Sequence, residues 1–269
     1  MSGADRIEGA LRRAQEAKRL AFIPYITAGD PDLEATKRVA AALAAAGADV
    51  LELGVPWTDP LADGPVNQRA AERALASGTT LRSILEAIPS IKNGAPLPVV
   101  LFTYFNPILR YGLERFALEA EGAGVEGVLV TDLPPEEAGE YRSALESRGL
   151  ATIFLATPTS TDGRLEAIAR ASSGFVYTVS RTGVTGPKTS IQEDLRALLE
   201  RLRRHTSIPV AVGFGISDAA QVASLRGMAD AFVVGSALVE RLERLGPGSE
   251  GIDAVSALAR ELVAAGGAG

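Results

Sequence analysis

Residues 51–68 read LELGVPWTDPLADGPVNQ, and this stretch holds the pattern that decides the fold. An apolar strand ends here, and a long loop rich in proline leads to a helix whose first residue is proline. The stretch places one carboxylate, Glu52, at the end of the strand and a second, Asp63, in the loop. Two carboxylates in such a position are sufficient to serve as a general acid and a general base.

The same strand and helix unit recurs along the whole chain. Each strand-like run is mostly apolar at both odd and even positions, which is typical of strands buried on two faces. Each run is followed by a segment with helical periodicity. We count eight runs, at residues 21–27, 48–54, 97–104, 125–132, 150–157, 174–180, 208–215 and 230–236. Eight units in a row predict an α/β fold, a (β/α)8 or TIM barrel, with one extra helix at each end.

Length and composition favour one barrel domain that spans residues 1–269. Barrels of this class commonly run to about 250 residues, and no linker or low-complexity tract divides the chain. We expect residues 1–19 to form a helix packed on the barrel and the glycine-rich residues 264–269 to be frayed. A doubly wound open sheet is the competing architecture. It would carry a glycine-rich nucleotide fingerprint after its first strand, where residues 27–31 instead read TAGDP.

Composition excludes several classes of function. The net charge is -6 and the basic residues are scattered, so no basic patch is expected for nucleic acid or an anionic membrane. The chain has no cysteine and a single histidine, His205 at the end of a helix, so a transition-metal site is not expected. The first residues form a charged amphipathic helix without the apolar core of a secretory signal, and no run is long enough to span a membrane. We therefore expect a cytoplasmic location.

In a barrel the active site is built from the loops that follow the strands, so we expect both carboxylates to lie in the active site. Glu52 lies between leucines, and the partial desolvation that we expect would raise its pKa and suit a proton donor near neutral pH. The alternative is a buried glutamate paired with a basic residue. Asp63 precedes Gly64 and Pro65, so its alternative role is to cap a turn before the helix.

Glycine recurs at the ends of the last three predicted strands. Residues 181–187 read RTGVTGP, residues 213–217 read GFGIS, and Gly235 and Ser236 directly precede a helix. Loops that feed helix N-termini after the seventh and eighth strands are the usual phosphate site of this fold, because exposed backbone N–H groups bind anions. A single glycine could simply permit a tight turn, but three at adjacent strands favour a phosphate site.

Two long loops, residues 56–64 and 181–190, follow strands on the same face of the predicted barrel. Such loops are candidates for lids that exclude water, although ordinary surface loops are the alternative. Asp132 follows the fourth predicted strand, in a segment that reads DLPPEE, and we expect it to be structural, at the start of a helix with acidic residues in its first turn.

Seven motifs at successive strand ends carry a resemblance that covers nearly the whole chain. Besides residues 51–68, they are PYITAGDP (24–31), TYFNP (103–107), TDLPPEE (131–137), SRTGVTG (180–186), GFGIS (213–217) and VGS (234–236). In order and spacing the chain resembles the tryptophan synthase alpha chain family. The resemblance implies a lyase that cleaves indole-3-glycerol phosphate to indole and glyceraldehyde 3-phosphate, a step of L-tryptophan biosynthesis.

The resemblance also implies roles for individual residues. Glu52 would protonate C3 of the indole ring and then help to deprotonate the side-chain hydroxyl, while Asp63 would accept or stabilise the indole N–H proton. The chemistry independently requires such a pair, since the ring carbon needs a proton and the ring nitrogen needs charge relief. The other implied residues are Gly186, Gly215, Gly235 and Ser236 for the phosphate, Tyr25, Tyr104, Leu129, Tyr177 and Phe214 for the indole pocket, and Arg181 and Thr185 for the lid, where Thr185 would contact Asp63.

The resemblance implies a partner as well. Members of the family work with a beta chain that carries pyridoxal phosphate, in an alpha-beta-beta-alpha heterotetramer, and the face with both lid loops would be the docking surface. No cofactor or metal is expected on this chain. The sequence departs from the family pattern at Tyr25 and Trp57, where Phe is more common, at Thr58, where Ser is usual, and at Asn67, where an apolar residue is common. Asn67 puts a polar group near the pocket, which could shift ring affinity.

Three alternatives remain open from the sequence. A different phosphate-binding barrel, such as a phosphosugar isomerase, would be favoured if Glu52 and Asp63 pointed away from the pocket. A non-catalytic subunit would bind the ligand and activate the beta chain without cleaving anything. A free-standing lyase would release indole without a partner.

Overall fold

Parallel strands form one continuous sheet in the computed structural model, which describes residues 1–179, 188–213 and 215–267, without the side chains of residues 188–192. The strands are β1 (Ala21–Thr27), β2 (Leu51–Gly54), β3 (Val99–Thr103), β4 (Gly127–Val130), β5 (Ala151–Ile153), β6 (Leu155–Ala156), β7 (Val176–Val179), β8 (Val210–Gly213) and β9 (Ala231–Val234). Their order in the sheet is β5-β4-β3-β2-β1-β9-β8-β7-β6.

The two ends of this sheet belong to one run of chain. β5 pairs with β4, β6 pairs with β7, and only Phe154 separates β5 from β6. These two short strands are therefore the two halves of the strand predicted at residues 150–157, which brings the sheet round into a barrel. The eight predicted strand positions and the (β/α)8 architecture are confirmed.

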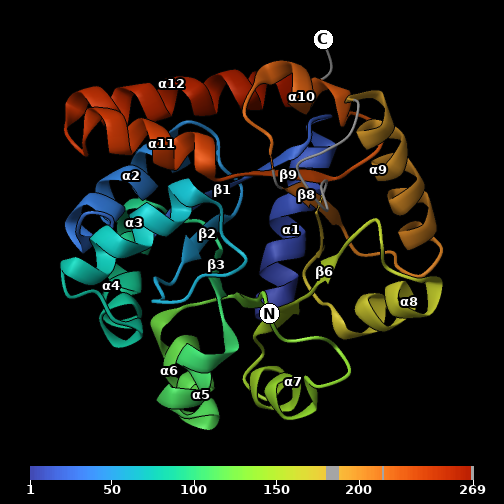
Figure 1. Cartoon of the computed structure of the whole chain (residues 1–269), viewed down its shortest axis with the longest axis horizontal. Coiled ribbons are helices and arrows are strands. Elements are labelled where there is room, and N and C mark those ends of the chain that lie inside the picture. Colours follow the sequence, from blue (N-terminus) through green and yellow to red (C-terminus); the bar gives the residue numbers. More distant parts are fainter. Residues whose placement is uncertain (180–187, 214, 268–269) are drawn as a thin grey trace.

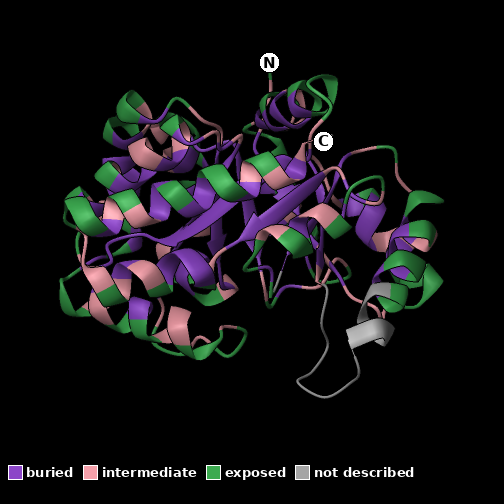
Figure 2. Cartoon of the chain, turned by 90° about the horizontal axis from the view of Figure 1, so that it is seen from above, coloured by how far each residue is buried: buried purple, intermediate pink, exposed green. Residues whose placement is uncertain are grey.

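Helices surround the barrel (Figure 1). They are α1 (Gly3–Glu16), α2 (Leu33–Ala45), α3 (Pro65–Ala76), α4 (Leu81–Gly94), α5 (Phe105–Tyr111), α6 (Leu113–Ala123), α7 (Gly139–Glu146), α8 (Asp162–Ala171), α9 (Lys188–Arg203), α10 (Ala219–Ser224), α11 (Ser236–Leu245) and α12 (Ser249–Gly266). Figure 2 shows buried strands inside and exposed residues on the outer helix faces. Within the described chain, no helix is both long and apolar enough to cross a membrane.

Side chains of the strands form two apolar layers. Outward residues such as Leu51 and Leu53 pack with the helices, whereas inward residues such as Ile23 and Val100 belong to the cluster inside the barrel. Helix α1 joins the inner cluster through Ile7 and Leu11, which are fully buried. Its approach is close, because a Cβ added at Gly127 would lie 3.0 Å from Cδ1 of Ile7. The N-terminal helix thus lies against the end of the barrel opposite the loops that follow the strands.

The C-terminal segment differs from the expectation of a frayed tail from residue 264. Helix α12 continues to Gly266, whose carbonyl accepts a hydrogen bond of 3.0 Å from the Leu20 N–H. Gly267 forms an isolated bridge with Arg19. Packing against the chain that enters β1 therefore outweighs the low helix propensity of the glycines. Residues 268–269 lie outside the described chain.

The segment after β4 also differs from the prediction. Helix α7 begins only at Gly139, and residues 131–138 form turns that contain Pro134 and Pro135. Oδ1 of Asp132 accepts a hydrogen bond of 2.7 Å from the N–H of Phe105, the first residue of α5. The expectation of a helix start at Asp132 was wrong, because this carboxylate serves the neighbouring helix α5.

Candidate active site

Glu52 points into the barrel. Its neighbours in β2, Leu51 and Leu53, pack in the outer apolar layer, and side chains alternate along a strand. In register, Glu52 lies between Tyr25 of β1 and Val100 of β3, both members of the inner cluster. The side chain is consequently buried, with 1% of the residue exposed.

No basic residue pairs with Glu52 within the described part of the chain, so the ion-pair alternative is not what the structure shows. Its Oε1 atom is buried and has no hydrogen-bond partner there. Burial without a compensating charge disfavours the ionised form and raises the pKa of Glu52 to about 8. The carboxyl therefore holds its proton at neutral pH, as an acid catalyst must before it reacts.

Asp63 lies in the loop between β2 and α3, where Tyr104 holds it. The Tyr104 hydroxyl donates a hydrogen bond of 3.0 Å to Oδ2 of Asp63 and accepts one of 2.9 Å from the Ala62 N–H. Helix α3 begins with Pro65 after Gly64, and no side chain caps it, so Asp63 does not have the capping role of the alternative interpretation. Burial raises the pKa of Asp63, while hydrogen bonds from Tyr104 and Asn67 oppose the increase.

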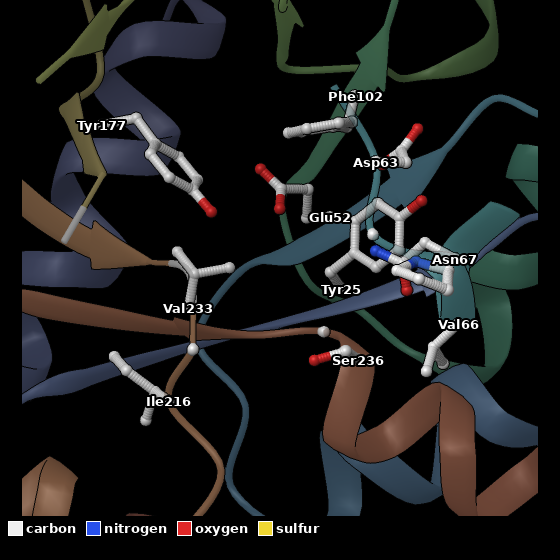
Figure 3. Close-up of a pocket in the computed structure, with 14 residues that line it drawn as sticks. Tyr25, Glu52, Asp63, Val66, Asn67, Phe102, Tyr177, Ile216, Val233 and Ser236 are labelled. Carbon is white, nitrogen blue, oxygen red and sulfur yellow. The ribbon is translucent and has the colours of Figure 1, made fainter. Parts of the chain in front are cut away.

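The two carboxylates line one cavity at the end of the barrel where the strands finish (Figure 3). Its volume is about 280 Å³, and its walls are mostly apolar side chains with a few polar groups, which is the usual composition of a small-molecule site. The described residues that line it are Tyr25, Glu52, Asp63, Gly64, Pro65, Val66, Asn67, Phe102, Tyr177, Gly215, Ile216, Val233, Gly235 and Ser236.

Several residues named from the sequence meet at this cavity, and others lie outside the described part of the chain. Tyr25, Tyr177, Gly215, Gly235 and Ser236 line it. Arg181, Thr185, Gly186 and Phe214 lie outside the described residues.

Tyr104 and Leu129 are not part of the described lining, and their place in the indole pocket stays a prediction. Tyr104 supports the loop that carries Asp63, and Leu129 is fully buried in the inner cluster. The apolar residues that sequence reasoning missed are Phe102, Val66, Ile216 and Val233. The period of two along β3 places Phe102 on the same face as Val100, but it could not be used until the inward face was known.

Two glycines make room for the tyrosines of the cavity. A Cβ at Gly54 would lie 2.2 Å from the Tyr25 hydroxyl oxygen, and a Cβ at Gly213 would lie 2.1 Å from the Tyr177 hydroxyl oxygen. Contacts this short are not possible, so both tyrosine rings lie over positions that only glycine can fill. From sequence, the glycine at position 213 suggested only a turn or a phosphate contact.

The other end of the cavity is formed by the start of α11. Gly235 is the N-cap residue and Ser236 the first residue of this helix. N–H groups in the first turn of a helix lack partners within the helix, and the helix dipole favours negative charge there. Gly215, with φ of 80°, brings the β8 loop to the same cavity. This end is suited to a phosphate group.

The loop from β2 to α3 also presents an exposed surface. Leu61 is 85% exposed, and the Arg110 guanidinium carbon lies 5.6 Å from the centroid of the Trp57 ring. In contrast, the described residues contain no cluster of three or more His, Asp or Glu side chains that could hold a metal ion. His205 lies just after α9, at the end of the barrel where the strands begin.

Residues 11–265 match the family model of the tryptophan synthase alpha chain. The chain belongs to the tryptophan synthase alpha chain family. It is 51% identical over 248 residues to the alpha chain of Bordetella parapertussis, covering 91% of this chain and 87% of the relative. It is 50% identical over 244 residues to that of Solibacter usitatus, covering 91% and 90%.

Solved structures agree with the sequence relatives. A tryptophan synthase structure from Mycobacterium tuberculosis superposes with a TM-score of 0.89 at 39% identity and covers 98% of this chain and 99% of that chain. The alpha subunit of Legionella pneumophila gives a TM-score of 0.89 at 34% identity and covers 98% of both chains. As a tryptophan synthase alpha chain, the protein is a lyase of tryptophan biosynthesis with a TIM-barrel fold.

Proposed function

We propose that the cavity with Glu52 and Asp63 is the site at which this tryptophan synthase alpha chain cleaves indole-3-glycerol phosphate to indole and glyceraldehyde 3-phosphate. One observation carries the proposal: a buried carboxyl without an ionic partner and a hydrogen-bonded carboxylate line the same cavity. These are the acid and the charge-stabilising group that the reaction requires.

The reaction proceeds through two proton transfers at Glu52. The protonated carboxyl first gives its proton to C3 of the indole ring, and the ring nitrogen becomes positively charged. Asp63 accepts a hydrogen bond from the N–H and stabilises this charge. The Glu52 carboxylate then takes the proton of the hydroxyl on the carbon attached to C3. The bond between C3 and the carbon that carries this hydroxyl breaks, and its electron pair restores the aromatic ring. The hydroxyl carbon becomes an aldehyde, and Glu52 is left protonated.

The remaining lining residues bind the substrate. Backbone N–H groups at Gly215, Gly235 and Ser236, with the Ser236 hydroxyl, bind the phosphate, and Gly186 remains a predicted fourth contact. Tyr25, Phe102 and Tyr177 bury the aromatic ring. Arg181 and Thr185 remain predictions for the lid, as does Phe214 for the indole pocket.

The partner proposal rests on the family and on the exposed loop surface. The docking surface for a beta chain includes the loop with Leu61 and Trp57, and the assembly is an alpha-beta-beta-alpha heterotetramer. Each proposed step is a proton transfer or the cleavage of one bond, so the mechanism needs no cofactor on this chain, and pyridoxal phosphate belongs to the beta chain. A cytoplasmic location also stays a prediction.

Indole release from indole-3-glycerol phosphate tests the proposal, with and without a tryptophan synthase beta chain. We expect slow release by the purified chain and a strong increase with the partner. Glu52→Gln and Asp63→Asn should each lower kcat by roughly 10²-fold or more. The control is Glu140→Gln, which changes an exposed carboxylate on α7 and should keep wild-type rates.

The other outcomes separate the alternatives. Fast release without the beta chain would indicate a free-standing lyase. No release under either condition would indicate a regulatory subunit or a different barrel enzyme. Release by both carboxylate variants at the wild-type rate would contradict the assigned roles of Glu52 and Asp63.

A further inference from the structure

Asn67 brings an unsatisfied polar atom to the proposed site. It lies in the first turn of α3 and lines the cavity with Glu52 and Asp63 (Figure 3). Its Oδ1 atom is buried, and no group in the described residues donates a hydrogen bond to it. Of the described residues that line the cavity, only Glu52 has another such orphaned atom.

The chemistry of Asp63 fixes which end of the Asn67 amide remains free. An ionised carboxylate can only accept hydrogen bonds, so the Asn67 side chain supports Asp63 through its Nδ2 group. Oδ1 therefore remains as an acceptor. A buried acceptor without a partner costs about 1–3 kcal/mol, a cost that an apolar side chain at this position would avoid. A ligand that donates a hydrogen bond to Oδ1 would remove this cost.

The substrate has three donors for these acceptors. They are the indole N–H, the hydroxyl on the carbon attached to the ring, and the middle hydroxyl of the glycerol chain. In the proposed mechanism, Asp63 takes the N–H and Glu52 takes the hydroxyl next to the ring. The middle hydroxyl is left, and Oδ1 of Asn67 is the remaining orphaned acceptor in the described lining.

The position of Asn67 agrees with this assignment. The middle carbon of the substrate lies between the ring, which the carboxylates bind, and the phosphate, which the start of α11 binds. Helix α3 packs against α11, and Arg69 and Arg73 of α3 donate hydrogen bonds to Glu243 of α11. Asn67 lies in the first turn of α3, directly after the loop with Asp63, and it lines the same cavity as Gly235 and Ser236 at the start of α11.

We propose that Asn67 is a specificity-determining residue whose Oδ1 atom accepts a hydrogen bond from the middle hydroxyl of the glycerol chain. This inference rests on the proposed function. It assigns a polar role to a position at which the sequence departs from the apolar pattern of the family.

Two substrates and one substitution test the inference. The first substrate is indole-3-glycerol phosphate, and the second is 3-hydroxy-3-(indol-3-yl)propyl phosphate, which lacks only the middle hydroxyl and still releases indole on cleavage. Asn67→Leu keeps a similar side-chain size and removes the acceptor. We expect kcat/KM for indole-3-glycerol phosphate to fall roughly 10-fold to 100-fold relative to that for the deoxy substrate. Asn67→Ala should lower the same ratio, kcat/KM for indole-3-glycerol phosphate over that for the deoxy substrate. This second variant shows whether the effect comes from loss of the acceptor or from the bulk of leucine.

The ratio of the two substrates separates this role from support of Asp63. Loss of the hydrogen bond to Asp63 would alter the pH profile for both substrates alike, whereas loss of the Oδ1 acceptor affects only the substrate with the middle hydroxyl. The control is Val66→Ala, which changes the cavity wall without changing a polar group and should affect both substrates equally.

An equal loss for both substrates in Asn67→Leu, or no loss for either, would overturn the inference while wild-type cleavage still supported the proposed function. If the wild-type chain released no indole in either setting, the proposed function itself would fail.

Discussion

The Tyr104 hydroxyl donates a hydrogen bond of 3.0 Å to Oδ2 of Asp63 and so fixes the carboxylate of a loop residue to the rigid end of β3. The same oxygen accepts a hydrogen bond from the Ala62 N–H. One tyrosine therefore sets both the path of the loop and the orientation of Asp63. Tyr104 is therefore a positioning residue, outside the described cavity lining.

Tyr104→Phe should raise the pKa of Asp63, because the hydrogen bond that favours the ionised carboxylate is lost. The acidic limb of the kcat/KM profile should then move to higher pH. The loss in kcat/KM should therefore be larger at pH 6 than at pH 7.5. Tyr141→Phe is the matched control, since its hydroxyl donates to the Val128 carbonyl away from the cavity. A profile for Tyr104→Phe with the wild-type shape would rule out this role.

Glu52 should make the fold less stable as the pH rises. Its pKa is about 8 in the folded chain, against an ordinary value of 4.5. Between these values the unfolded chain has lost this proton while the folded chain keeps it, so the free energy of unfolding falls with increasing pH. Below pH 4.5 the group has no effect, and above pH 8 the full penalty is present.

Denaturant unfolding of the wild-type chain and Glu52→Gln at pH 5 and pH 8.5 measures this contribution. The difference between the two proteins should change by a few kcal/mol in favour of Glu52→Gln at the higher pH. Comparison with the variant removes the effect of all other titrating groups. Two parallel pH dependences would show that Glu52 is ionised in the folded chain at neutral pH.

Gly213→Ala should displace Tyr177, because the added methyl group would lie 2.1 Å from the tyrosine hydroxyl oxygen. We expect a loss of stability of about 1–3 kcal/mol and a higher KM. Gly139→Ala is the control, since a Cβ there meets nothing within 4 Å. In the Gly213→Ala background, Tyr177→Leu should recover stability. Thermal melting measures both effects, and a Gly213→Ala melting temperature equal to that of the control would contradict the close approach.

The fold could be predicted because its signal is repeated. Eight apolar runs separated by helical segments leave few architectures, and small errors in one run do not change the result. Details that depend on a single contact could not be predicted. Asp132 bonds to the N–H of Phe105 rather than beginning its own helix, and Gly266 and Gly267 pack against the entry to β1.

The candidate site, like the fold, has features that could be predicted from the sequence and features that could not. Motif order identified Glu52 and Asp63, and the structure places both at one cavity. Residues on both faces of β2 are mostly apolar, so the sequence could not decide whether Glu52 faced the barrel interior or the helices. The pairing of Glu52 with Tyr25 and Val100 decides it. The supporting role of Tyr104 required the path of a loop that has no periodic pattern.

Glu52 can protonate the substrate only if its carboxyl carries a proton at neutral pH. The most direct test is a ¹³C NMR titration of the side-chain carboxyl groups in the full chain, with Glu52→Gln to assign the resonance. The resonance absent from Glu52→Gln should titrate near pH 8. A midpoint near the ordinary glutamate value of 4.5 would contradict it, since Glu52 would then be ionised before the substrate binds.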